Sequence, residues 1–247
     1  MSIWNEYEVR AESRGRTIRE TSLRREERMV NRKVRNNLSF QKVIIDGIDR
    51  EVSIIDSEIT NEKRIISLPR EDFDHGGLVF WKDNYWLITE KDASNVVYTR
   101  GRLVQCNHLL KWVTSNGTIM EQWCVIDDKA SYSSGELESP GYVVARGNTR
   151  TVMIIARNEE TVNFNRKNRF LIDDVDAEQK LAYTLTHPSK MGFTYNKKGV
   201  FRFVLQESMT TADDNHELGI ADYYKYYPKN PSSDNDDKQS SGKKVWL

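Results

Sequence analysis

The sequence predicts a mainly β protein: two small antiparallel β-barrel or sandwich domains, an N-terminal α-helical arm and an extended C-terminal tail. Short apolar and aromatic runs alternate with turn residues from Gly76 to Ile126, as in hairpin-built sheets. Residues 3–36 are rich in Arg and Glu and lack Pro, which favours helix. The predicted divisions are an arm (1–37), a first β domain (38–130), a second β domain (140–207) and a tail (208–247).

The arm is expected to form one or two helices, broken near Gly15, the single glycine between residues 3 and 36. Its apolar positions form only a thin stripe, which consists of Ile18, Leu23, Met29, Val30 and Val34. A helix with so little apolar surface is either solvated or packs as an arm on a partner.

The arm is also basic, with ten Lys or Arg, six Glu and a net charge of +4 between residues 3 and 36. One hypothesis is phosphate contact with a nucleic acid. The alternative is a solvated face or an ion-paired protein interface, because the acids are interleaved with the bases. The candidates for facing a DNA channel or a partner are Arg16, Arg19, Arg24, Arg25, Arg28, Arg32, Lys33 and Arg35.

Both β domains follow from apolar alternation and turn residues. From Leu38 the apolar period is two, and Asp46-Gly47 is a strong hairpin dipeptide between two strands. A third run ends at Pro69, and the hairpins of residues 76–126 complete the first domain. Residues 129–141 have linker composition. The second domain is predicted from runs at 142–145, 151–156, 170–172, 181–185 and 200–205, with a turn at Gly147-Asn148 and with Phe201, Phe203 and Leu205 on one face of the last strand.

The tail, residues 208–247, has no periodic pattern and is polar. We expect its aromatic and apolar residues to anchor it on another subunit, since rigid aromatics bury much area at low entropic cost. The alternative is that the tail folds back on its own domain. The interface candidates are Tyr223, Tyr224, Tyr226, Tyr227, Val245, Trp246 and Leu247.

The sequence contains no recognisable phosphate-binding loop, nucleophile elbow or zinc-protease motif, and its four histidines are scattered. The acidic run from Asp173 to Glu178 could bind calcium, but a hairpin loop is the simpler interpretation. Cys106 and Cys124 flank a predicted turn and are expected to be buried thiols rather than a disulfide or zinc ligands. We therefore expect no catalysis, no metal and no cofactor.

The charge balance, with 37 basic and 37 acidic residues, argues against a generally nucleic-acid-binding or membrane-surface protein, though not against local patches. No apolar window approaches the ~18 residues of a membrane span, and the first residues lack a signal-peptide pattern. The expectation is an intracellular origin without membrane insertion.

Residues 77–89 and 98–112 resemble neck proteins of tailed bacteriophages, the head-closure or head–tail connector family. Residues 168–174, 199–207 and 217–223 are similar to the second β domain of its larger members. The resemblance implies a subunit of a six- or twelve-copy ring between the portal or adaptor side and the tail, bounding the channel through which DNA passes. It implies a location in the virion neck, synthesis in the host bacterial cytoplasm, non-specific contact with DNA, and neither catalysis nor cofactor.

Other interpretations remain open at this point. A tail-completion or distal-tail ring protein would share the fold class and differ in location. A nucleic-acid-binding β-barrel module would use the arm and base stacking on exposed Trp81, Tyr85 or Trp86. If the neck interpretation holds, removal of residues 228–247 should leave both β domains folded and weaken ring assembly.

Overall fold

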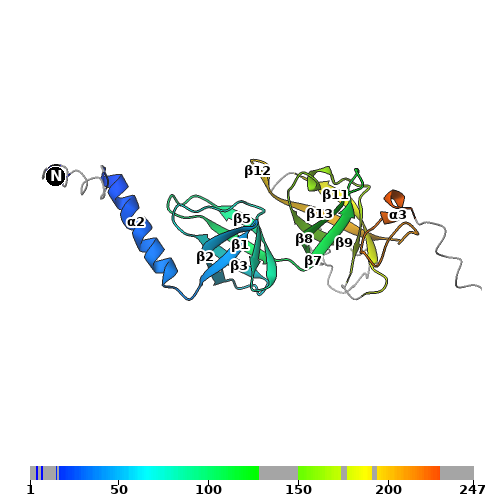
Figure 1. Ribbon diagram of the computed structural model, residues 1–247, viewed down its shortest axis with the longest axis horizontal. Coiled ribbons are helices and arrows are strands. Elements are labelled where there is room, and N and C mark those ends of the chain that lie inside the picture. The colour runs from blue at the N-terminus through cyan, green and yellow to red at the C-terminus, as the bar shows by residue number, and fades with distance from the viewer. Residues whose placement is uncertain are drawn as a thin grey trace, which may run out of the picture.

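The computed structural model describes residues 17–127, 150–173, 177–190 and 194–228, together with Trp4, Tyr7 and Gly15. Two barrel-like sheets lie side by side along the long axis, and a helix projects from the N-terminal one (Figure 1). The predicted fold class, mainly β with an N-terminal helix, is confirmed. No helix within these ranges is both long enough and apolar enough to cross a membrane.

The projecting helix is α2 (Ile18–Arg35), and it begins shortly after Gly15. Thr17 caps its N-terminus, where the threonine hydroxyl accepts the Glu20 amide at 3.1 Å. Arg32, Lys33 and Arg35 lie in the last turn, where positive charge suits the helix dipole. None of the 18 residues of α2 is buried, so tertiary packing contributes little to its stability.

The first barrel is a closed sheet with strand order β1-β2-β3-β6-β5-β4, in which β4 pairs back onto β1. Its strands are β1 (Phe40–Ile45), β2 (Ile48–Asp56), β3 (Glu62–Ser67), β4 (Leu78–Trp81), β5 (Asn84–Asp92) and β6 (Arg100–Gln105). Asp46-Gly47 and Lys82-Asp83 make two-residue turns with both φ angles positive, the geometry of tight hairpins. The core residues are Val43, Ile45, Val52, Ile54, Ile65, Phe73, Val79, Trp86, Ile88 and Leu103.

The second sheet has the order β10-β11-β13-β9-β8-β7, with β12 paired to β13. Its strands are β7 (His108–Val113), β8 (Ile119–Asp127), β9 (Arg150–Ala156), β10 (Arg169–Ile172), β11 (Leu181–Ser189), β12 (Thr194–Tyr195) and β13 (Lys198–Ser208). A short 3₁₀ helix, η2 (Thr161–Asn163), precedes Phe164, which lies in the core with Phe170 and Phe203. Phe201, Phe203 and Leu205 share one face of β13, as predicted, and that face lies in the core.

The sheets divide the chain earlier than the sequence predicted. The first barrel ends at Gln105, and β7 begins at His108, so residues 108–127 belong to the second sheet rather than to a domain that extends to residue 130. The cause is a non-local pairing, since β8 bonds to β9 with Cys124 opposite Ile155. The predicted linker at 129–141, the predicted strand at 142–145 and the turn at Gly147-Asn148 lie outside the described residues.

The two sheets meet in a packed contact rather than through a loose linker. Leu87 of the first barrel, Cys106 of the short connection, and Val125 and Val200 of the second sheet form a buried group, which we call the junction cluster. Leu87 is fully buried, and the rings of Tyr85 and Trp123 stack with centroids 4.8 Å apart. Apolar burial of this kind resists separation of the two bodies.

Backbone contact tightens the same junction. Gly76 has φ +85°, and a Cβ placed on it would lie 2.1 Å from the carbonyl oxygen of Gly199. Lys198 forms an ion pair with Asp74 at 3.3 Å, and the ring of Tyr195 lies 5.7 Å from that of His75. The β12–β13 hairpin of the second sheet therefore reaches the loop that precedes β4.

Residues 209–228 differ from the predicted extended tail. They bury Asp214, Asn215, Ile220 and Ala221, close a bridge between Asn215 and Ile220, and end in the short helix α3 (Tyr223–Tyr226). The prediction of an extended conformation is wrong for this part, which packs on its own sheet as the alternative proposed, while docking on a partner stays a prediction. Arg169 of β10 binds two acids of this segment, Asp214 and Asp222. Residues 229–247 lie outside the described part.

Candidate functional site

The arm presents two different sides. Five positions of α2 are partly buried. Four of them, Leu23, Glu27, Val30 and Val34, are spaced at three and four residues and share one side of the helix, and the fifth is Arg24. Glu27 accepts from Arg70 at 2.8 Å, and this hydrogen bond raises the pKa of the arginine. These contacts fix which side of the helix faces away from the barrel.

Seven of the eight basic candidates lie on α2, and Arg16 lies outside the described residues. Arg35 is an anchor rather than an outward group: it pairs with Glu51 at 2.8 Å, donates to Asn31 at 2.8 Å and lies over the Phe40 ring. The remaining candidates on the helix are Arg19, Arg24, Arg25, Arg28, Arg32 and Lys33.

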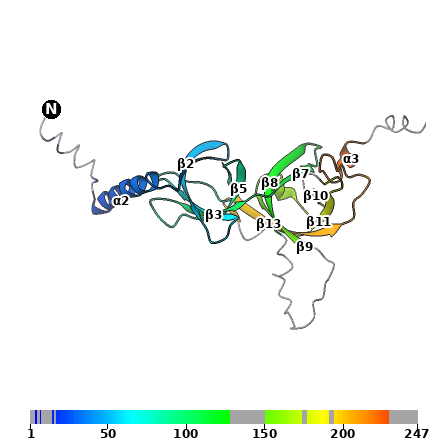
Figure 2. The same ribbon diagram turned by 90° about the horizontal axis from the view of Figure 1, so that it is seen from below.

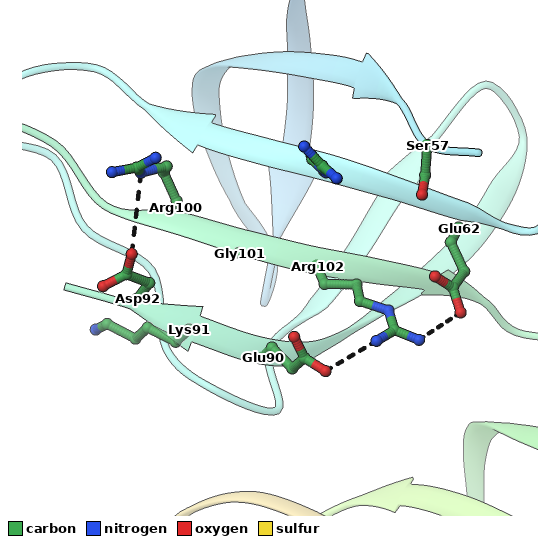
Figure 3. A pocket seen from close by; sticks show the side chains of 9 residues that line it. Ser57, Glu62, Glu90, Lys91, Asp92, Arg100, Gly101 and Arg102 are labelled. Atoms are coloured by element: carbon green, nitrogen blue, oxygen red, sulfur yellow. Dashed lines mark hydrogen bonds and ion pairs between the residues drawn. The ribbon is translucent and has the colours of Figure 1, made fainter. Parts of the chain in front are cut away.

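A charged hollow of about 390 Å³ lies on the outer surface of β3, β6 and β5 (Figure 3). Arg102 bridges Glu62 at 2.5 Å and Glu90 at 2.9 Å, and Arg100 lies 4.0 Å from Asp92. The bond to Glu62, aided by the charges of both glutamates, raises the pKa of Arg102 against the opposing effect of burial. Because bases and acids pair with each other here, the hollow suits a polar protein surface better than an isolated anion.

A second polar centre fixes the C-terminal segment. The Arg169 guanidinium donates to Asp214 at 3.0 Å through two nitrogens, to Asp222 at 2.8 Å and to the Met209 carbonyl at 2.8 Å. The Asp214 side chain is fully buried. Burial raises its pKa, but the bonds from Arg169 and from two backbone amides outweigh burial and lower it overall. Arg169 therefore stabilises residues 209–222 against β10.

The tyrosine candidates form a small cluster at the end of the second sheet. Tyr223 stacks on Tyr227 with centroids 4.8 Å apart, Tyr224 meets Tyr223 edge-on, and the Tyr227 hydroxyl donates to the Gly117 carbonyl. Tyr226 and Tyr227 remain 46% and 40% exposed, so they can contact another molecule. The candidates Val245, Trp246 and Leu247 lie outside the described residues.

Groups with reactive chemistry are few and mostly buried. Across the described ranges, no group of three or more His, Cys, Asp or Glu could hold a metal ion. Cys106 and Cys124 are free and buried, as predicted, and burial raises the pKa of Cys106 to about 12. Burial, aided by the charge of Lys180, lowers the pKa of His108. The acidic run from 173 to 178 lies between β10 and β11, with residues 174–176 outside the described part.

The aromatic residues considered for base stacking serve the fold. Trp86 is buried in the first core, Tyr85 stacks on Trp123 at the junction, and Trp81 packs partly buried beside Trp86. This removes the stacking platform that a nucleic-acid-binding barrel face would need.

The sequence did not reveal the close approach of Gly76 and Gly199, the ion pairs of Arg169 with Asp214 and Asp222, or which side of α2 faces away from the barrel. The 3.6-residue periodicity of the arm could have shown which charges share a side. The close approach of Gly76 to Gly199 had no comparable signal, because it depends on how two sheets meet.

Comparison with protein families gives a match over the N-terminal part of the chain. The family model described as the YomX N-terminal domain matches residues 17–105, which comprise α2 and the whole first barrel. This family is phage-derived, so the match supports a phage protein and is compatible with a virion component. The chain has no significant match among curated proteins or solved structures.

Proposed function

We propose that this chain is a structural virion protein of a tailed phage, which forms a ring at the head–tail neck and lines or seals the DNA channel. The observation that carries the proposal is the arm: α2 projects from the first barrel (Figure 2), and none of its residues is buried. An isolated helix of this length is marginal in water, so an arm of this kind gains stability by docking on a neighbour.

The rest of the chain supports the same role. The junction cluster and the Gly76–Gly199 approach make two small β bodies into one building block. Such a block suits a ring subunit, because a ring closes only if the same interface repeats with one rotation between neighbours. Together with the phage-derived family match, these features favour an assembly role over catalysis, and we propose that the protein is not an enzyme and needs no cofactor.

The partners we propose are further copies of this chain in a ring of six or twelve, the portal or adaptor and tail proteins of the same particle, and the DNA inside the channel. Native mass spectrometry of the purified full chain tests the ring directly. A discrete closed oligomer is expected, and a monomer at every concentration would count against the proposal.

Two truncations test which end carries assembly. Removal of residues 1–36 should abolish the oligomer while both sheets stay folded by circular dichroism, and removal of residues 228–247 should weaken the oligomer. An oligomer unchanged by both truncations would contradict a role for the chain ends in the ring.

Location within the particle separates this role from the tail-completion or distal-tail alternative, which the same fold could serve. Electron cryomicroscopy of the phage, with an epitope tag at the C-terminus of this chain, should place density between capsid and tail. Density at the distal end of the tail would replace the neck assignment with the alternative.

A further inference from the structure

The acids of α2 and several of its bases, interleaved in the sequence, lie on different sides of the helix. At about 100° per residue, the side opposite Leu23, Glu27, Val30 and Val34 can be assigned from the helix geometry. We call this side the outward face, and its central positions are Ile18, Thr21, Arg25, Arg28, Met29 and Arg32. All three glutamates of the helix, Glu20, Glu26 and Glu27, fall outside the half that points away from the barrel.

The outward face is open and its charges are uncompensated. Ile18 and Met29 are 89% and 59% exposed, and Arg25, Arg28 and Arg32 are exposed as well. Within the described ranges, none of these three arginines forms an ion pair; the Arg28 Nε donates to the Arg24 carbonyl at 3.1 Å, which leaves its terminal nitrogens available. Guanidinium groups are the side chains best suited to phosphate oxygens.

The spacing of the three arginines also fits a duplex backbone. From residue 25 to residue 32 the helix rises roughly 10 Å, at about 1.5 Å per residue. That is the axial length of about three phosphates on one strand, at roughly 3.4 Å each. Two ion pairs hold the helix against the barrel: Glu27, on the opposite side, pairs with Arg70, and Arg35, the last residue of the helix, pairs with Glu51.

We propose that the outward face of α2 is a sequence-independent binding site for the phosphate backbone of duplex DNA, made by Arg25, Arg28 and Arg32. This deepens and rests on the proposed function, because a ring around a DNA channel would present such a face to the duplex. It narrows the eight basic candidates to three and assigns Arg35 to anchoring. The exposed Ile18 and Met29 flank the arginines without opposing charge.

The test is a titration of a labelled duplex of arbitrary sequence with the full chain, followed by fluorescence anisotropy at several salt concentrations. The variant is Arg25→Gln, Arg28→Gln, Arg32→Gln. Its matched control, Lys42→Gln, Arg166→Gln, Lys167→Gln, removes the same charge from exposed positions in β1 and in the turn before β10. Circular dichroism checks that both retain helix and strand.

The unchanged protein should bind with steep salt dependence. For each protomer on the duplex, loss of three phosphate contacts should reduce the slope of log affinity against log salt concentration by about 2.7. At about 0.1 M salt this corresponds to an affinity for the duplex that is weaker by a factor on the order of 500. The control should change the slope little. An equal loss of duplex affinity in both variants, or no duplex binding by the full chain, would overturn the proposed binding site on α2.

Native mass spectrometry of the same samples separates this site from the proposed ring. A full-chain oligomer that does not bind DNA would reject the site and leave the ring proposal standing. Conversely, binding that depends on the three arginines in a chain that never oligomerises would support the site and count against the ring. An oligomer lost in the three-arginine variant, with no DNA binding by the unchanged chain, would mark the face as a protein interface and overturn the proposal.

Discussion

Replacement of Gly76 by Ala should loosen the junction between the two sheets and lower the free energy of unfolding. The expected loss has two parts. The first is conformational, because φ +85° costs an L-residue about 1–2 kcal/mol. The second is steric. The new Cβ would lie 2.1 Å from the Gly199 oxygen, where ordinary contact begins at 3.4 Å, so backbone must move by more than an ångström. Overpacking of this kind costs about 1–3 kcal/mol.

Gly47→Ala is the matched control. Gly47 has φ +81°, and nothing lies within 4 Å of its added Cβ, so this variant should show the conformational part alone. Urea denaturation of both full-length variants, followed by tryptophan fluorescence, should give Gly76→Ala the larger loss of unfolding free energy, by about 1–3 kcal/mol. Near-ultraviolet dichroism should report disturbance of the Tyr85–Trp123 stack in Gly76→Ala only. Equal losses for the two variants would refute the steric reasoning.

Three further predictions concern other parts of the fold. Asp214→Ala should lower the unfolding free energy by about 3 kcal/mol or more in urea titrations, because it leaves the mostly buried Arg169 with one carboxylate fewer. The pKa of Asp214 is lowered in the folded state, so its contribution to stability is complete above its unfolded pKa of about 3.9 and is lost as pH falls through the folded value. Asp214→Asn should therefore flatten the acid side of the curve of stability against pH, and an unchanged acid side would contradict this. Cys106 and Cys124 should react with a thiol reagent at neutral pH only after unfolding, since both are buried and the pKa of Cys106 is about 12; rapid labelling of the native protein would argue against this packing. Tyr227→Phe should cost about 0.5–1.5 kcal/mol in thermal or urea unfolding, through loss of its hydrogen bond to the turn after β7, and a neutral result would mean that water replaces the bond.

Local features of the fold were predictable from the sequence. Asp46-Gly47 forms a hairpin turn because Asp and Gly tolerate the positive φ that such turns require. The alternation of Phe201, Phe203 and Leu205 identified a core-facing strand, because a strand has a period of two. In each case the information lies within a few neighbouring residues.

Features that depend on distant residues were missed. The hairpin of β7 and β8 continues the hairpin pattern of the first barrel, and only the pairing of Cys124 with Ile155 assigns it to the second sheet. Asp214 looked like part of a solvated tail, yet it is buried because Arg169, 45 residues earlier, neutralises it. The interleaved charges of the arm suggested a mixed face until the barrel fixed which side points outward.

The boundary of the first barrel limits how this module can be joined to other domains. The matched region stops at Gln105, the last residue of β6, so the boundary of the related module coincides with the boundary of the closed barrel. That module is not self-sufficient at its surface, because Leu87 is covered by Val125 and Val200 of the following sheet. Any gene fusion that transplants this barrel in front of a different partner domain must therefore supply a new apolar cap and a backbone able to approach Gly76, which restricts the successors this module can accept during evolution.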